Sequence, residues 1–425
     1  METLIGGFIF YRGRSKRTGQ TDERAPSVSV EDGSCREGMS NEGPGSPMEA
    51  AGDPSVDSRR GPSFYGLHIF GHYIRTEDAI MTLWLFFNII SGIWTVAFGM
   101  PASVYLGELI TTALPMIFYY AGRRTGDRNA FYRNFIAAVV FVGILGVVLY
   151  ITAPDFYLDY LFRLEYISKA DAATMRVRML SVIGSTLMGY LAAAAMLASF
   201  HFIIRSGGKK GKLLFLVNCF LAFMSNQRSA MTVAILIVIY VNILVFFTFH
   251  MLPKRIFKVE CIAVAIGFVA FVTAFHGAFM KIYYRLVSLP GAVGQRSDQW
   301  VGAANNMADK WLGNGLGANG HRAAEYTKHM IADGGLAKLY CEMGIVGTAL
   351  FAFLMILVVR KGLGHLKACA PELGIVVMTL LVSIGSNVMS FALSVPIFYY
   401  AVGAIVHETG FGSRPHDLER DGGQP

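Results

Sequence analysis

A charged, glycine-rich stretch lies between two apolar runs, from about residue 280 to residue 335. It contains Arg285, Arg296, His321, Arg322 and Asp333, and these residue types are suited to chemistry on an anion. A guanidinium group binds two phosphate oxygens at once, and a carboxylate or an imidazole can take a proton from a hydroxyl group. We therefore expect the chemistry of this chain, on an anionic substrate, to lie in this stretch.

A further arginine, Arg228, lies upstream in the sequence Ser-Asn-Gln-Arg-Ser-Ala between two apolar runs. An arginine at a membrane boundary is costly unless its side chain reaches the interface or is paired. Two interpretations stay open here: an anchor that snorkels to the interface, or a clamp for an anion.

Arg296 precedes a segment with helical periodicity. Apolar side chains recur there at i, i+4, i+7, i+8 and i+11, namely Trp300, Ala304, Met307, Ala308 and Trp311. This spacing predicts a helix over residues 298–311 that lies flat on the outer surface of a bilayer, with its tryptophans at the lipid–water interface. Such a helix would hold Arg296 near a lipid headgroup. The alternative is a helix that packs on the rest of the protein.

The glycine-rich run at residues 312–320 allows tight turns and close backbone approach. It lacks the Lys-Ser/Thr ending of a nucleotide-binding loop. Asp333 precedes a predicted helix that begins near Leu336, so it is either a helix N-cap or a general base. Glu342 and Glu108 lie inside apolar runs, where a carboxylate needs a partner and is a functional candidate.

The histidines of the stretch, His321 and His329, lack the spacing of a metal-binding motif. The cytoplasmic loops show no nucleotide-binding pattern. We therefore expect neither a metal nor another cofactor, and charge stabilisation would come from arginine.

The chain that must position these residues has 425 residues, of which 54% are hydrophobic and 16% are charged. Its mean hydropathy is +0.46. Apolar runs of about 20 residues match the length at which a helix crosses the hydrocarbon core, and backbone groups in lipid must be satisfied within the helix. The sequence therefore predicts an all-α, polytopic transmembrane bundle. About ten spans are expected, at residues 80–99, 103–121, 135–153, 179–204, 213–224, 230–249, 259–279, 336–359, 373–389 and 391–406.

Basic residues follow the second, fourth, sixth and eighth predicted spans, for example Arg123 and Arg124 after the second. The positive-inside bias places these loops and both termini in the cytoplasm. The large loop at 280–335, between spans seven and eight, is then external. The net charge of +8 does not indicate nucleic-acid binding, because the basic residues lie in short loops between spans.

Three parts of the chain follow from this pattern. Residues 1–75 are polar and rich in Gly, Ser and Pro, which predicts a disordered cytoplasmic tail. Residues 76–406 form the transmembrane domain with its external loop at 280–335. Residues 407–425 form a cytoplasmic C-terminal tail.

Several stretches together resemble the O-antigen polymerase and O-antigen ligase superfamily of bacterial membrane glycosyltransferases. They are residues 225–230, 295–300, 312–317, 333–347 and 386–403. The resemblance covers roughly residues 80–406 and depends on the order of the motifs and their shared external side. It implies a GT-C-like fold. It also implies transfer of a glycan from an undecaprenyl diphosphate carrier at the periplasmic face of the bacterial inner membrane, without a metal.

The same resemblance implies roles for the arginines. Arg228 and Arg296 match the arginines that the family assigns to the diphosphate, and Arg285 or Arg322 would assist them. The partners implied are the undecaprenyl-diphosphate-linked glycan and the lipid bilayer, with a chain-length regulator protein as a further candidate.

Asp333 stands where ligases of this family carry a histidine, and this difference favours a polymerase that joins repeat units with inversion. Asp333 is the first candidate for the base and His321 the second. Two alternatives remain. One is an O-antigen ligase that transfers finished polymer to a lipid A core. The other is a flippase or exporter of lipid-linked oligosaccharides, which should place its charges at mid-membrane between repeats.

Overall fold

The computed structural model describes residues 66–69, 72–124, 127–152, 156–157, 179–251 and 289–410, with a few single positions between 273 and 287. The predicted span at 259–279 and Arg285 lie outside the described residues, apart from position 273 of that span. The predicted tails, 1–75 and 407–425, are described only where they join the bundle.

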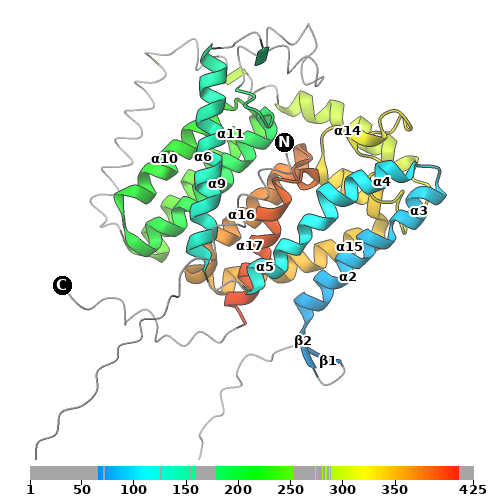
Figure 1. The fold of residues 1–425 in the computed structure, drawn as a ribbon, viewed down its shortest axis with the longest axis horizontal. Coiled ribbons are helices and arrows are strands. Elements are labelled where there is room, and N and C mark those ends of the chain that lie inside the picture. The colour runs from blue at the N-terminus through cyan, green and yellow to red at the C-terminus, as the bar shows by residue number, and fades with distance from the viewer. Residues whose placement is uncertain are drawn as a thin grey trace, which may run out of the picture.

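The described chain is predominantly α-helical (Figure 1). Its longer helices are α2 (Thr76–Ile90), α6 (Arg128–Thr152), α9 (Ser185–Ser206), α10 (Lys209–Met224), α11 (Arg228–Ile243), α14 (Leu289–Asn305), α15 (Gly335–Gly364), α16 (Leu366–Gly385) and α17 (Val395–Glu408). Shorter helical segments are α3 (Gly92–Ala97), α4 (Ala102–Glu108), η1 (Leu109–Ala113), η2 (Leu114–Ile117), α5 (Phe118–Arg124), η3 (Leu244–Thr248), η4 (His321–Ala323) and η5 (Val388–Ser390). Several of these continue one another, so α4, η1, η2 and α5 form one long rod.

One short antiparallel hairpin, β1 (Gly66–Ile69) and β2 (His72–Arg75), precedes α2 within the stretch that the sequence predicted as disordered. Arg75 explains its order at this point. The Arg75 guanidinium donates hydrogen bonds to the carbonyl oxygens of Val406 and Gly410, at 3.1 and 2.7 Å. The end of the hairpin is therefore attached to the C-terminal end of α17.

Within the described residues, seven helical segments are long and apolar enough to cross a membrane. They are Thr76–Ala97, Ala102–Arg124, Arg128–Thr152, Ser185–Ser206, Arg228–Thr248, Gly335–Gly364 and Leu366–Gly385. The predicted polytopic helical bundle is confirmed at this level, but the predicted ten spans are not. With 16 and 14 residues, α10 and α17 are too short: their lengths of about 24 and 21 Å fall below a hydrocarbon core of about 30 Å.

The core of the bundle is centred on α9, of which 83% is buried inside the protein. Its run of four alanines, Ala192–Ala195, is fully buried. Small side chains let neighbouring backbones approach closely, which is the usual way in which membrane helices pack. Around α9 lie α6, α10, α11 and α16.

Close backbone approach also determines the contact between α5 and α17. A Cβ atom added at Gly122 would lie 2.2 Å from the carbonyl oxygen of Tyr400. One added at Gly403 would lie 2.0 Å from the carbonyl oxygen of Tyr119. Only glycine fits at these two positions, so this pair of helices packs backbone against backbone.

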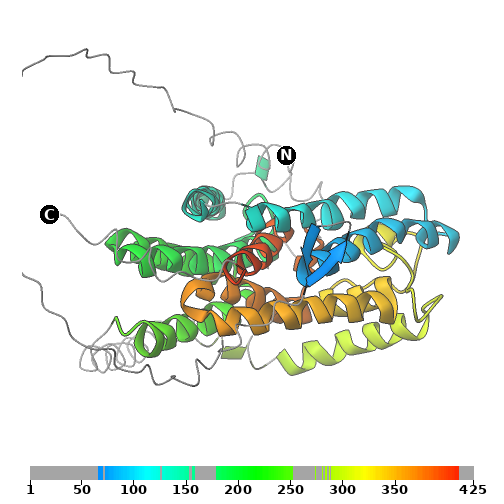
Figure 2. The ribbon, with the colours of Figure 1, turned by 90° about the horizontal axis from the view of Figure 1, so that it is seen from below.

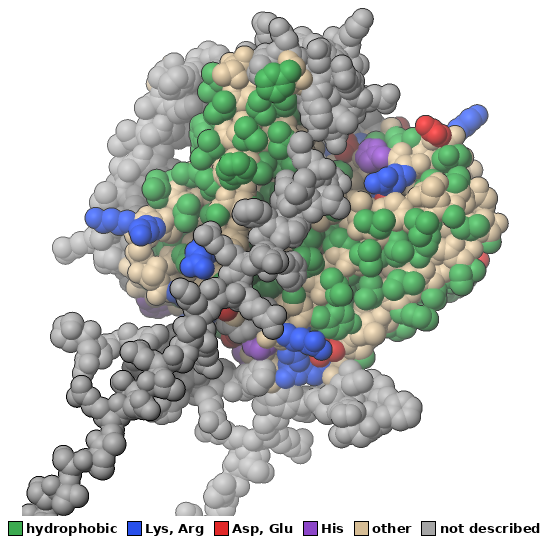
Figure 3. Space-filling view, viewed as in Figure 1, with side chains coloured by type: hydrophobic (Ala, Val, Ile, Leu, Met, Phe, Trp, Pro, Cys, Tyr) green, Lys and Arg blue, Asp and Glu red, His purple; other side chains and the backbone are tan. Residues whose placement is uncertain are grey.

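Charged and hydrophobic side chains are segregated on the surface. Large hydrophobic side chains are exposed along the helices, for example Phe141 at 70% and Ile151 at 73%. Figure 3 shows them over the middle of one face, with charged side chains toward its two ends. We call the end with the ion pairs Arg123–Asp78, Arg128–Glu372 and Lys361–Glu77 the basic end. The opposite end, where α14 and the N-terminus of α15 lie, is the loop end.

Candidate functional site

The loop end contains an ion pair between two residues that the sequence singled out separately. Arg296, on α14, places Nη2 2.7 Å from Oδ2 of Asp333, in the segment just before α15. Arg296 Nη1 also donates to the carbonyl oxygen of Gly385, the last residue of α16, at 3.2 Å. The two paired side chains are 32% and 42% exposed. They are therefore accessible to a substrate while the backbone around them is held.

The helix that carries Arg296 differs from its prediction. α14 covers Leu289–Asn305 rather than residues 298–311, and Trp311 lies beyond it with 64% of its surface exposed. Its apolar side packs on the protein, since Ala303 is buried with Ile331 and Cys341. Figure 2 shows α14 alongside α15. Of the two alternatives, packing on the bundle is the one observed, because this face is covered by the segment before α15.

Asp333 is not the N-cap of α15. The helix begins at Gly335, and its N-cap, Gly334, has a φ of 123° and no side-chain cap. A Cβ atom at Gly334 would lie 2.4 Å from Nε1 of Trp300, so glycine is required there. The Trp300 indole N–H donates to the carbonyl oxygen of Asp333 at 2.7 Å. The backbone of Asp333 is thus held by α14, and its carboxylate is left for the ion pair.

The turn after α16 supports the same segment. The Asn387 side-chain amide donates to the carbonyl oxygens of Ile331 and Ala332, both at 2.9 Å. The Gly335 N–H donates to the carbonyl oxygen of Ser386 at 3.2 Å. The sequence pointed to residues 386–403 as a motif but assigned Asn387 no role. Its signal was the pair of polar residues that ends an apolar run.

Arg228 reaches this region from α11, where it is the first helical residue. Its neighbour Ser229 lies 3.4 Å, Oγ to Oγ, from Ser386, which follows the Gly385 carbonyl that Arg296 contacts. The Arg228 side chain is half-buried, and its guanidinium has no hydrogen bond or ion pair to any described residue. The site therefore combines an unpaired guanidinium with the paired Arg296.

The other predicted site residues are not joined to this pair. His321 and Arg322 lie on η4 and are exposed. The Arg322 side chain covers Gly107 on α4, where an added Cβ would lie 2.8 Å from Arg322 Cδ. In the described part of the chain, no hydrogen bond or ion pair connects either side chain to Arg296 or Asp333. Arg285 lies outside the described residues.

The glycine-rich run fills a break in α15. Gly344, inside that helix, has φ 63° and ψ −166°, which interrupts the helical hydrogen bonds. The freed carbonyl oxygens of Cys341 and Glu342 accept hydrogen bonds from the backbone N–H groups of Asn314 and Gly315, at 2.9 and 2.8 Å. These donors are already used by the protein, so this part of the run is a structural plug and not a cradle for phosphate.

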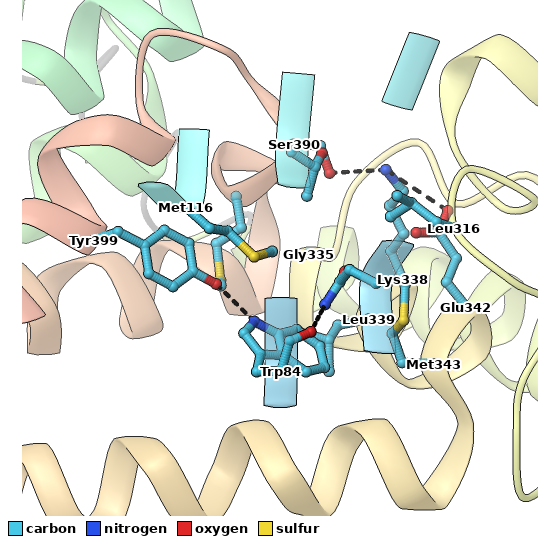
Figure 4. Close-up of a pocket in the computed structure, with 13 residues that line it drawn as sticks. Trp84, Met116, Leu316, Gly335, Lys338, Leu339, Glu342, Met343, Ser390 and Tyr399 are labelled. Atoms are coloured by element: carbon cyan, nitrogen blue, oxygen red, sulfur yellow. Dashed lines mark hydrogen bonds and ion pairs between the residues drawn. The ribbon is translucent and has the colours of Figure 1, made fainter. Parts of the chain in front are cut away.

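Below the N-terminus of α15 lies a buried charge cluster. The Lys338 ammonium forms ion pairs with Glu108, on α4, and with Glu342, one turn further along α15. It also donates to the Ser390 hydroxyl at 2.8 Å (Figure 4). A cavity of about 30 Å³ adjoins the cluster and is also lined by Trp84. The sequence singled out both glutamates but missed Lys338, whose signal was its i, i+4 spacing from Glu342.

The arrangement at the loop end can bind an anion and accept a proton. Two arginines come from helices that meet the turn at Ser386, and a carboxylate stands beside one of them. Among the residues that the structure describes, no group of three or more His, Cys, Asp or Glu side chains forms a metal-binding cluster. No protein-family model and no curated protein matches the sequence.

Proposed function

We propose that this protein is a membrane glycosyltransferase of the polysaccharide-polymerase type. It would join oligosaccharide repeat units carried on undecaprenyl diphosphate into O-antigen or exopolysaccharide chains. It would act in the bacterial inner membrane, with both termini in the cytoplasm and the loop end in the periplasm. The observation that carries the proposal is the Arg296–Asp333 pair, held beside Arg228 at the end of the bundle opposite the basic end.

The arginines would act on the leaving group. A diphosphate gains negative charge as its bond to the sugar breaks, and preorganised cations are the main means of stabilising such charge. Arg228 has no partner among the described residues, and Arg296 is held by one carboxylate and one carbonyl oxygen. A diphosphate carries more than one negative charge and competes with Asp333 for Arg296. Two arginines can serve in this way without a metal ion.

Asp333 would act on the acceptor. When the diphosphate takes Arg296, the Asp333 carboxylate is released beside the reacting sugar. The acceptor hydroxyl oxygen attacks the anomeric carbon, its proton passes to Asp333, and the bonding electrons of the sugar–phosphate bond leave with the diphosphate. A single displacement of this kind inverts the anomeric centre. The Trp300 and Asn387 hydrogen bonds would keep the Asp333 backbone in place during the exchange.

The ion pair supplies the decisive test. An Arg296→Ala protein should insert and fold but make no long chains, and lipid-linked single repeat units should accumulate. Lys328→Ala is the matched control, because Lys328 is an exposed cation of the same loop. Normal chain length with Arg296→Ala, at wild-type protein levels, would remove the main support for the proposal.

The lipid-linked intermediates of a deletion strain separate the alternative functions. Single repeat units at the outer face, with no long chains, are the result expected for a polymerase. Long chains that remain on the carrier, with bare acceptor, would indicate a ligase. Single units trapped on the cytoplasmic face would indicate a flippase. The buried cluster does not favour that last outcome, since Lys338 lies in the first turn of α15 rather than at its middle.

A further inference from the structure

The buried cluster at the start of α15 has more carboxylates than cations. The side chains of Glu108, Lys338 and Glu342 are only 6%, 4% and 4% exposed. One ammonium therefore faces two buried carboxyl groups. No other cation among the described residues forms an ion pair with either of them. An uncompensated buried charge is costly, so a further positive charge must be present in the cluster.

The ammonium is committed to Glu108. Lys338 Nζ donates hydrogen bonds to Glu108 Oε1 and to the Ser390 hydroxyl. Glu108 also accepts a hydrogen bond from the Thr112 hydroxyl at 2.9 Å. Glu342 Oε1, in contrast, lies 3.7 Å from Nζ, which is beyond hydrogen-bonding distance. Glu108 is thus the ionised partner of Lys338.

Glu342 has weaker compensation. It accepts the backbone N–H of Asn319 at 3.2 Å, faces the backbone of Gly317, and lines the cavity beside the cluster. If Glu342 were ionised, it would add a second negative charge near Glu108 with no cation of its own. Long hydrogen bonds from neutral backbone groups do not offset that burial.

The other titratable groups near the cluster do not supply the missing charge. Tyr399 also lines the cavity, and its hydroxyl accepts the Trp84 indole N–H at 3.0 Å. Arg322 covers Gly107, next to Glu108, but it is exposed and has no hydrogen bond or ion pair to either glutamate in the described structure.

We propose that Glu342 binds a proton, so that the cluster consists of a Glu108–Lys338 ion pair and a neutral carboxylic acid that faces the cavity. A proton fits better than an alkali cation, because the Lys338 ammonium already occupies the space between the carboxyl oxygens and would repel a second ion. The cavity of about 30 Å³ has room for about two water molecules that could exchange this proton.

The neutral acid has a consequence for the loop end that depends on the proposed function. An ionised Glu342 would add a negative charge below the N-terminus of α15, where an incoming diphosphate must approach Arg296. A protonated Glu342 leaves the arginines as the dominant charges of that region. The proton itself can be tested without any assay of glycosyl transfer.

Infrared spectroscopy of the purified protein at neutral pH tests this assignment, because a protonated carboxyl group has a carbonyl stretch separate from those of carboxylates and amides. Glu342→Gln should lose one such band relative to the wild type, and Glu108→Gln should lose none. Glu342→Gln should also fold and melt like the wild type, since glutamine is a neutral mimic of the protonated acid.

Three results would overturn the proposal. The first is the absence of any lost band in Glu342→Gln, and the second is loss of the band only in Glu108→Gln. The third is a Glu342→Gln protein that fails to fold. Replacing sodium by choline at constant ionic strength tests for a bound alkali cation: carboxylate bands that change with sodium, without a protonated band, would assign the missing charge to the ion. If Glu108→Gln does not fold, the Glu342→Gln comparison still decides.

Discussion

Replacing Lys338 by methionine should destabilise the protein by about 4–6 kcal/mol. The Lys338 and Glu108 side chains are 4% and 6% exposed, and loss of one partner of a buried ion pair costs about 3–5 kcal/mol because the other charge stays without a counter-ion. The 2.8 Å hydrogen bond to the Ser390 hydroxyl is lost as well, which adds about 1 kcal/mol. Methionine keeps most of the apolar volume of the lysine stem, so a cavity contributes little.

Thermal unfolding in a mild detergent, followed as the fraction of monodisperse protein, measures this loss. At about 2 °C per kcal/mol, the midpoint should fall by about 8–12 °C. Lys328→Met is the matched control, because Lys328 is exposed and surface changes usually stay within about 0.5 kcal/mol. The double variant Lys338→Met/Glu108→Gln should recover most of the loss, since it removes the stranded charge.

Two results would refute the electrostatic reasoning. A Lys338→Met protein that melts at the wild-type temperature would mean that Glu108 does not depend on this counter-ion. A double variant as unstable as Lys338→Met would mean that the loss comes from packing and not from charge.

Three further variants test the site and its supports. Asp333→Asn should slow chain formation from lipid-linked repeat units by about 10²–10⁴-fold, as for a lost general base; an unchanged rate would place the base elsewhere. Asn387→Ala should cost about 1–3 kcal/mol in thermal unfolding, because two buried carbonyl oxygens lose their donor, and it should lower the rate of chain formation with Asp333 still present. Gly344→Ala should unfold at a clearly lower temperature, because its φ is 63° and the added Cβ would lie 2.3 Å from the Trp311 carbonyl oxygen. Gly364→Ala is its control, since an added Cβ there meets nothing within 4 Å, and it should melt like the wild type.

The class of the fold and most helix positions were predictable from the sequence. The length and hydrophobicity of a run are local properties, and in lipid they leave few alternatives to a helix. All seven candidate spans, beginning with Thr76–Ala97, overlap predicted spans from which neither end differs by more than about seven residues. The importance of Arg296 and Asp333 was also predictable, because charged residues of these types stood out against an apolar chain.

Other features depended on contacts that local patterns do not encode. The periodicity after Arg296 predicted an amphipathic face, but both a membrane and a protein surface can cover such a face. The tertiary structure decided for the protein, through Ile331 and Cys341. The glycine-rich run had the composition of a flexible loop, and its role as a plug appears only with the break at Gly344.

Partner choice is the clearest division between the two levels. Composition and hydropathy alone show that buried carboxylates such as Glu108 need a cation, because an isolated charge in an apolar run is costly. They do not show which cation, since Lys338 is 230 residues away along the chain. The pairing of Arg296 with Asp333 spans 37 residues in the same way. The sequence determined which groups required partners, and the packing of the helices decided which groups met, because that depends on distances set by the whole bundle.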